Sequence, residues 1–163
     1  MSFHKQLRDK IITKEVAAKR LNALRKAGKK IVFTNGCFDI LHPGHVDYLS
    51  QARDLGDFLV LGLNTDRSVK KLEKAPNRPI NSEQTRALVL AGLACVDAIV
   101  WFDEVTPYEL IKYLQPDVLV KGNDYAVETI VGYDVVKARG GAVITIPMLD
   151  GYSTTALIKK ING

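Results

Sequence analysis

The residues best suited to chemistry lie between positions 34 and 45, in the stretch TNGCFDILHPGH. His42 and His45 are three residues apart, so both side chains could reach one ligand if a helix begins here. Pro43 suits the first turn of a helix, and Gly44 allows a ligand to approach the backbone closely. A helix N-terminus offers free N–H groups and roughly half a positive charge. This stretch therefore predicts a phosphate site that both histidines contact.

The same residue types could instead bind a metal ion. Cys37, His42 and His45 all carry ligand-type side chains. A tetrahedral set needs a fourth ligand, and the remaining candidates, Cys95 and His4, are far away in the sequence. We therefore expect no metal site built from protein side chains.

A second group of chemically suited residues is Ser153-Thr154-Thr155, just before an apolar helical pattern. Three hydroxyls at a helix start can cap the helix or bind phosphate oxygens, and the residues alone leave both readings open. Two further segments carry charge: a turn-rich segment with Lys70, Lys71 and Lys74, which we expect to be a mobile loop, and the turn 121–124.

Apolar strands and amphipathic helices alternate along the whole chain. The predicted strands are 31–33, 58–63, 98–101, 118–120 and 143–146, and the predicted helices are 13–28, one starting at 43, a short one after 64–66, 82–94, one capped by Thr106 and ending at 114, 127–138, and one starting near 153. This order predicts a Rossmann-like, doubly wound α/β fold with five parallel strands. We expect a single domain over 1–163, with an N-terminal helical extension (1–28) before a core (29–161). Its ligand should lie beyond the carboxyl ends of the strands, at a topological switch point.

Composition narrows the function. The 163 residues suit one domain, and 47% of them are hydrophobic. The net charge is +5, but the basic residues are scattered, which favours small phosphorylated ligands over nucleic acid. No apolar run approaches the roughly 18 residues of a membrane helix, so no membrane association is expected. Two cysteines make no disulfide framework, and we expect a reducing, cytoplasmic location.

Several common catalytic motifs are absent from the sequence. No Gly-x-Gly-x-x-Gly follows a strand, and no Gly-x-x-x-x-Gly-Lys-Ser/Thr occurs. Gly-x-Ser-x-Gly is also missing. Dinucleotide oxidoreductases, phosphate-binding-loop kinases and serine hydrolases are therefore disfavoured.

The His-Pro-Gly-His and Ser-Thr-Thr elements, in this order and over a hundred residues apart, resemble the two signatures of the His-x-Gly-His (cytidylyltransferase-like) nucleotidyltransferase superfamily. Within it, the chain is most similar to the branch that activates heptose 1-phosphate with ATP. The segments typical of that branch are 34–42, 78–81, 95–97, 116–122 and 124–125.

The resemblance implies transfer of AMP from ATP to D-glycero-β-D-manno-heptose 1-phosphate, with release of pyrophosphate. It also implies Mg²⁺ supplied with ATP, and a homodimer. The implied catalytic residues are His42, His45, Lys74 and Lys121. The implied nucleotide-binding residues are Thr34, Asn35, Gly36, Cys37, Phe38, Gly44, Asn64, Arg86, Gly122, Asp124, Tyr152, Ser153, Thr154 and Thr155. On the acceptor side it implies Asp39, Lys71 and Lys74.

The chain departs from the family pattern in three places. The lysine loop is longer by about a residue, so Lys74 and Lys71 both fit the acceptor-side lysine. Asn123 stands where the heptose branch often has Gly, and Met148-Leu149-Asp150 replaces the Arg-Thr-Glu of glycerol-phosphate cytidylyltransferases. Two alternatives stay open: a transferase that uses CTP and an alcohol phosphate, and a non-catalytic nucleotide-binding scaffold. The protonation state of the two histidines is also open.

Overall fold

A computed structural model describes residues 2–124 and 126–163, so Tyr125 of the branch-typical segment lies outside the described residues. Five parallel strands form one sheet in the order β3-β2-β1-β4-β5. They are β1 (Ile31–Gly36), β2 (Phe58–Asn64), β3 (Ala98–Phe102), β4 (Val118–Gly122) and β5 (Ala142–Ile146). The predicted doubly wound, five-stranded parallel fold is thus confirmed.

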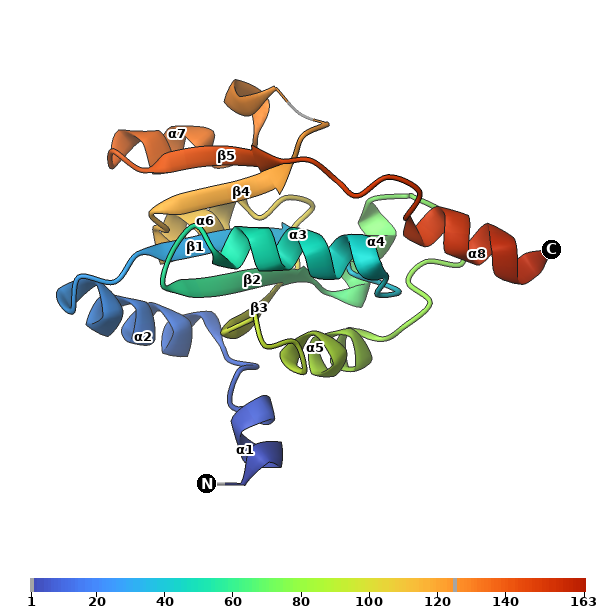
Figure 1. Ribbon diagram of the computed structural model, residues 1–163, viewed down its shortest axis with the longest axis horizontal. Coiled ribbons are helices and arrows are strands. Elements are labelled where there is room, and N and C mark those ends of the chain that lie inside the picture. The colour runs from blue at the N-terminus through green and yellow to red at the C-terminus, as the bar shows by residue number, and fades with distance from the viewer. Residues whose placement is uncertain (1, 125) are drawn as a thin grey trace.

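Helices cover both faces of the sheet (Figure 1). Side chains alternate along β1, so that Val32 packs with α3 (Pro43–Arg53) and α5 (Glu83–Ala91) on one face. Its neighbours Ile31 and Phe33 face the opposite side, where they pack with α2 (Lys14–Lys26), α6 (Tyr108–Leu114) and α7 (Tyr133–Ala138). A parallel sheet buried on both faces explains the nearly continuous apolar runs in the sequence.

The N-terminal residues belong to the same folded unit. Ser2 caps α1 (Phe3–Arg8), a helix that the sequence pattern did not reveal. Ile11 then forms a parallel bridge with Ile99 in the edge strand β3. Ala17 and Leu21 of α2 are buried in the core. The extension of residues 1–28 therefore packs on the sheet and its core.

The single helix predicted for 127–138 is wrong. The structure has a short 3₁₀ turn, η1 (Val127–Thr129), and then α7, separated at Gly132. Gly132 has φ of 90°, and a Cβ there would lie 2.7 Å from Cδ1 of Ile111. Gly132 is the N-cap at which α7 begins, and both its left-handed conformation and its close approach to Ile111 of α6 favour glycine there. The approach to α6 is not visible in local sequence.

The carboxyl edge of the sheet is open between its central strands. The β1–β2 ladder runs from Ile31–Phe58 to Gly36–Leu63, whereas the β1–β4 ladder is limited to Val32–Val118 and Phe33–Leu119. β1 and β4 therefore separate towards their carboxyl ends, as expected at a switch point. Two further helices lie at this edge, α4 (Asp66–Lys71) and α8 (Thr154–Asn162), and α8 lies beyond the strand ends, apart from the sheet (Figure 1). Among the described residues, no helix combines the length and apolar character that crossing a bilayer requires.

Candidate active site

A cavity of about 360 Å³ lies at the switch point. We call it the histidine cavity because His42 and His45 line it. Most of the residues singled out in the sequence meet there, namely Asn35, Gly36, Cys37, Phe38, Asp39, Lys74, Lys121, Gly122, Asp124, Tyr152, Ser153, Thr154 and Thr155. The turn after β1, the end of β4 and the start of α8 thus converge on one place.

The two histidine rings are stacked at the start of α3. Their centroids are 3.7 Å apart and their planes differ by 21°. His42 is the N-cap of α3, but its side chain makes no capping hydrogen bond, and Pro43 occupies the first turn as predicted. The first turn of α3 therefore presents its dipole and backbone N–H groups to the cavity without a side-chain cap, an arrangement suited to phosphate.

Glycine and an unusual backbone conformation shape the histidine turn. A Cβ on Gly44 would lie 3.0 Å from the His42 ring and 3.3 Å from the Cβ of Tyr152, so a larger residue would crowd both side chains. Phe38 has φ of 47°, which is rare for a bulky residue and typical of functional sites when it occurs. This conformation places the Phe38 ring edge-on to His45, with centroids 5.1 Å apart.

Several polar atoms at the histidine cavity have no protein partner. Asn35 Oδ1 and the Nδ1 atoms of His42 and His45 are buried, with no hydrogen-bond partner among the described residues. Unsatisfied buried polar atoms are costly and call for an explanation such as a ligand. Burial lowers the pKa of both rings, that of His45 to about 4 with a further contribution from His42. Without ligand, both histidines are therefore neutral at pH 7.

The hydroxyl cluster at the start of α8 has mixed roles. Ser153 accepts a hydrogen bond from the Ala156 amide, so its hydroxyl caps α8. Thr154 donates weakly to the Ile40 carbonyl (3.4 Å), which ties α8 to the histidine turn. All three hydroxyl residues line the cavity, and Tyr152 stacks at 6.3 Å from His42. Capping and cavity lining are thus compatible in this cluster.

Two lysines connect the histidine cavity with a second one. The adjoining cavity, of about 250 Å³, shares Lys74, Lys121 and residues 35–37 with the first. It is further lined by Asn64, Leu72, Val105, Thr106, Pro107, Thr129, Ile130 and Val131. Burial, together with the charge of the neighbouring Lys74, lowers the pKa of Lys121 to about 8. Both lysines therefore stand where a ligand in one cavity would meet a ligand in the other.

Five predicted site residues lie outside the lining of the histidine cavity, namely Thr34, Gly44, Asn64, Lys71 and Arg86. Thr34 is fully buried and bonds to Tyr48 (2.8 Å) and the Val120 carbonyl (3.1 Å), which fills the gap where β1 and β4 separate. Gly44 acts through the His42 ring, as described above. Lys71 Nζ donates to the Asp103 carbonyl (3.0 Å), away from both cavities. Asn64 lines the adjoining cavity instead.

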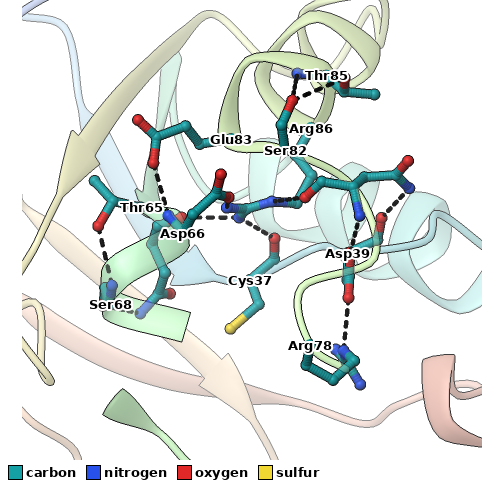
Figure 2. Close-up of polar contacts among 12 residues, drawn as sticks. Cys37, Asp39, Thr65, Asp66, Ser68, Arg78, Ser82, Glu83, Thr85 and Arg86 are labelled. Carbon is teal, nitrogen blue, oxygen red and sulfur yellow. Dashed lines mark hydrogen bonds and ion pairs between the residues drawn. The ribbon is translucent and has the colours of Figure 1, made fainter. Parts of the chain in front are cut away.

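The predicted contact between Arg86 and the nucleotide is not what the structure shows. The Arg86 guanidinium is buried and lines neither cavity, and Figure 2 shows its polar contacts. Its Nη1 donates to the Cys37 and Asn64 carbonyls, both at 2.8 Å, and its Nη2 to Asp66 at 2.8 Å. A buried guanidinium needs several hydrogen-bond acceptors, and here the protein itself supplies them. Arg86 therefore joins the ends of β1 and β2.

Sequence reasoning did not assign several residues that line the two cavities. Tyr48, Arg78 and Met148 line the histidine cavity, and Thr106 and Thr129 the adjoining one. Thr106 was expected to cap α6, but the N-cap is Pro107 and no side chain caps that helix. The sequence pattern therefore marked Thr106 only as a helix cap, and gave no sign that it lines a cavity.

The metal alternative gains no support. Among residues 2–124 and 126–163, no three His, Cys, Asp or Glu side chains come together in a way that could hold an ion. Cys37 is buried and Cys95 half-buried, and both are free thiols. The polar groups of the site are instead imidazoles, ammonium groups, hydroxyls and helix termini, which suit an anionic ligand.

A doubly wound sheet with stacked histidines and a hydroxyl-rich helix start at its switch point defines the nucleotidyl-transferring class of α/β enzymes. A profile of the cytidylyltransferase-like family matches residues 33–160, and the chain belongs to that family.

Named relatives agree with this assignment. The bifunctional protein HldE of Syntrophotalea carbinolica is 56% identical over 152 residues, which cover 93% of this chain and 31% of that protein. HldE of Wolinella succinogenes is 52% identical over 162 residues, or 99% of this chain and 33% of that protein. The chain thus spans about a third of the length of these curated relatives. The crystal structure of the lipopolysaccharide core biosynthesis protein from Thermoplasma volcanium matches with a TM-score of 0.64 and 26% identity, covering 76% of this chain and 100% of that one.

Proposed function

We propose that this chain is an adenylyltransferase that transfers AMP from ATP to D-glycero-β-D-manno-heptose 1-phosphate, giving ADP-heptose and pyrophosphate for cell-surface glycan synthesis. The observation that carries the proposal is the pair of cavities joined by Lys74 and Lys121, one of which contains the stacked histidines. Two joined cavities of these sizes suit two substrates that react at their junction. The heptose acceptor follows from the segments typical of that branch and from the high identity to HldE proteins.

In the proposed reaction, an oxygen of the acceptor's phosphate attacks the α-phosphorus of ATP. The new P–O bond forms as the bond between the α-phosphorus and the β-phosphate oxygen breaks, and pyrophosphate leaves with that electron pair. The attacking phosphate is already ionised at neutral pH, so the protein needs no general base. Its contribution is positioning and the stabilisation of charge that develops on the α-phosphate.

The residues have distinct roles in this scheme. Neutral His42 and His45 donate hydrogen bonds to the α-phosphate, while the starts of α3 and α8 face the triphosphate. Lys121 and Lys74 neutralise the two phosphates that meet at the junction. The adjoining cavity takes the sugar: its Asn64, Thr106 and Thr129 side chains are suited to hydroxyl groups.

Mg²⁺ belongs to this scheme as part of the substrate MgATP. The described residues offer no protein cage for the ion. Mg²⁺ commonly reaches nucleotide sites with its ligands supplied mainly by substrate phosphates and water. Asp124 is the acidic residue that lines the histidine cavity apart from the buried Asp39.

The proposal predicts a clear preference for ATP over CTP and for heptose 1-phosphate over glycerol 3-phosphate. A site that hydrogen-bonds one base leaves polar atoms unpaired when another base enters, and such mismatches can reduce kcat/KM by about 10²-fold or more. Measuring kcat/KM by pyrophosphate release for both nucleotides with both acceptors tests it. If CTP with glycerol 3-phosphate is the best pair, the heptose assignment is wrong although the fold and the phosphate site stand. If no pair reacts while nucleotide still binds, the scaffold alternative holds.

Lys74 and Lys71, the second of which ends α4 and does not lie in a loop as expected, should give different results. Lys74→Ala should reduce kcat/KM for the acceptor by about 10²-fold, because a cation at the junction of the cavities is lost. Lys71→Ala is the matched control, since its ammonium group is bonded to the Asp103 carbonyl away from the site. Steady-state kinetics of both variants decide the matter. Equal kinetics of wild type and both variants would show that the loop is ordinary surface.

A homodimer and a cytoplasmic location stay predictions that rest on the family resemblance. Large apolar side chains are exposed on and near α8, including Leu149 (42%) and Ile161 (74%), which is compatible with contact between subunits.

A further inference from the structure

The segment between α4 and α5 has two parts with different surroundings. Residues 73–77, which include Lys74, are all exposed. Arg78 is buried, and Arg78, Ile80 and Asn81 donate hydrogen bonds to Asp39 in the turn after β1. The exposed part is therefore a short stretch fixed at one end by α4 and at the other by Arg78.

Asp39 is the residue to which the buried part is bonded. Its carboxylate accepts hydrogen bonds from Nε of Arg78 (2.6 Å) and from the backbone amides of Ile80 (2.9 Å) and Asn81 (2.9 Å). The Asn81 side chain donates back to the Asp39 carbonyl (2.7 Å). We call this set of four residues the Asp39 anchor, and Figure 2 shows part of it.

Arg86 forms a further contact with the Asp39 anchor. Its Nε donates to the Asn81 carbonyl (3.1 Å), while its Nη1 bonds the Cys37 carbonyl in the turn of the histidines. One guanidinium thus bonds both the end of the lysine loop and the backbone two residues before Asp39 (Figure 2). The position of the loop relative to the histidine turn is set by these contacts.

The burial of the ion pair argues for a geometric role. The side chains of Asp39 and Arg78 are 0% and 8% exposed. Burying an ion pair costs desolvation energy that its attraction often fails to exceed, so a buried pair is weak evidence of a gain in stability. The pair does fix geometry, because a charge-assisted hydrogen bond holds the two side chains in a defined orientation. Asp39 lies three residues before His42 in the sequence, so it relates the loop directly to the catalytic turn.

We infer that Asp39 and Arg78 are positioning residues that hold Lys74 at the junction of the two cavities. This inference rests on the proposed nucleotidyl transfer and changes the role expected for Asp39, from contact with the acceptor to support of the loop that contacts it. Positioning errors are expensive in catalysis, since a displacement of about 1 Å can reduce the rate about 10²-fold.

The test is a double-mutant cycle with Arg78→Ala and Lys74→Ala. Arg78→Ala should reduce kcat/KM for the acceptor about 10- to 100-fold, while the Kd for a non-hydrolysable ATP analogue changes less than about twofold. In the Lys74→Ala background, Arg78→Ala should add less than about twofold, because the two residues act as one unit. Arg78→Lys should restore part of the activity, since Arg78 bonds Asp39 through a single nitrogen in the structure. Multiplicative losses in the cycle, or an equal loss of analogue binding, would overturn the inference.

Arg53→Ala is the matched control. Arg53 pairs with Asp97 at 2.7 Å, at the opposite edge of the sheet, and this pair is partly buried. The Arg53→Ala substitution should lower Tm without changing kcat or KM. If Arg53→Ala reduces activity as much as Arg78→Ala does at a similar Tm, the effect of Arg78 is general destabilisation and the inference fails.

A second readout does not depend on the reaction. Limited trypsin digestion followed by mass spectrometry should show faster cleavage after Lys74 in Arg78→Ala than in wild type, because the loop has lost its anchor. Unchanged cleavage would contradict the anchor even if the kinetics change. If wild type catalyses no transfer but cleavage does accelerate, the proposed function fails and the structural part of the inference stands.

Discussion

Replacing either histidine of the stacked pair with alanine should reduce kcat by about 10²–10³-fold, the usual cost of removing one donor that stabilises charge in the transition state. The Nδ1 atoms of both rings are buried and have no hydrogen-bond partner in the part of the chain that the structure describes, and the rings line the cavity that suits the triphosphate. Charge develops on the α-phosphate mainly during the reaction, so nucleotide affinity should change far less than kcat. Steady-state kinetics together with calorimetric titration of an ATP analogue measure both quantities.

The third histidine of the chain provides the control for this experiment. His4 is exposed on α1 and accepts a hydrogen bond from Arg8, far from the cavities in the structure. His4→Ala should keep wild-type kinetics. Near-wild-type kcat in both His42→Ala and His45→Ala would show that the active site has been assigned to the wrong place.

The second large effect is expected at Lys121, where alanine should again cost about 10²–10³-fold in kcat/KM. Burial and the nearby Lys74 lower the pKa of Lys121 to about 8. The ammonium group is therefore charged below pH 8 and loses its proton as the pH rises through that value. Because the charged form is the one that attracts phosphate, kcat/KM should fall on the alkaline side, with a midpoint near pH 8.

Arginine at this position separates charge from other effects. Arg stays protonated throughout the accessible range, so Lys121→Arg should move the alkaline limb well above pH 8, even if the larger side chain lowers the maximum rate. Lys112→Arg, on the exposed face of α6, should leave the profile unchanged. A wild-type profile that is flat up to pH 9.5, or an Arg variant that retains the limb near pH 8, would exclude this role for Lys121.

The sheet and the phosphate-facing elements could be predicted from sequence because local patterns encode them. Strands buried on both faces are written as apolar runs, of which Leu59 to Leu63 is the clearest. His-Pro-Gly-His and Ser-Thr-Thr are contiguous, so residue order alone brings their members together. At the break before α7, in contrast, Gly132 takes a left-handed conformation and lies close to Ile111 in another helix. Local sequence carries no record of that contact.

The adjoining cavity could not be predicted for a related reason. Thr106 and Thr129 come from separate connections, and each looks like an ordinary turn or capping residue in its own segment. Arg86 is the reverse case: its family position implied a ligand contact, whereas in the structure its guanidinium donates to the Cys37 and Asn64 carbonyls and to Asp66. Only the folded structure shows which polar groups bond to other groups of the protein and which remain available to a ligand.

The short ladder between β1 and β4 has a consequence for the cohesion of the molecule. Beyond Phe33 and Leu119 the strands β1 and β4 separate, so this pair of neighbouring strands has the shortest ladder in the sheet, and it lies next to the site. His42 and His45 follow β1, whereas Lys121 lies at the end of β4. If the proposed nucleotide site is correct, a nucleotide that contacts residues after β1 and residues after β4 would oppose the separation of the two strands by its binding free energy. We therefore expect bound nucleotide to raise the stability of the sheet at this place.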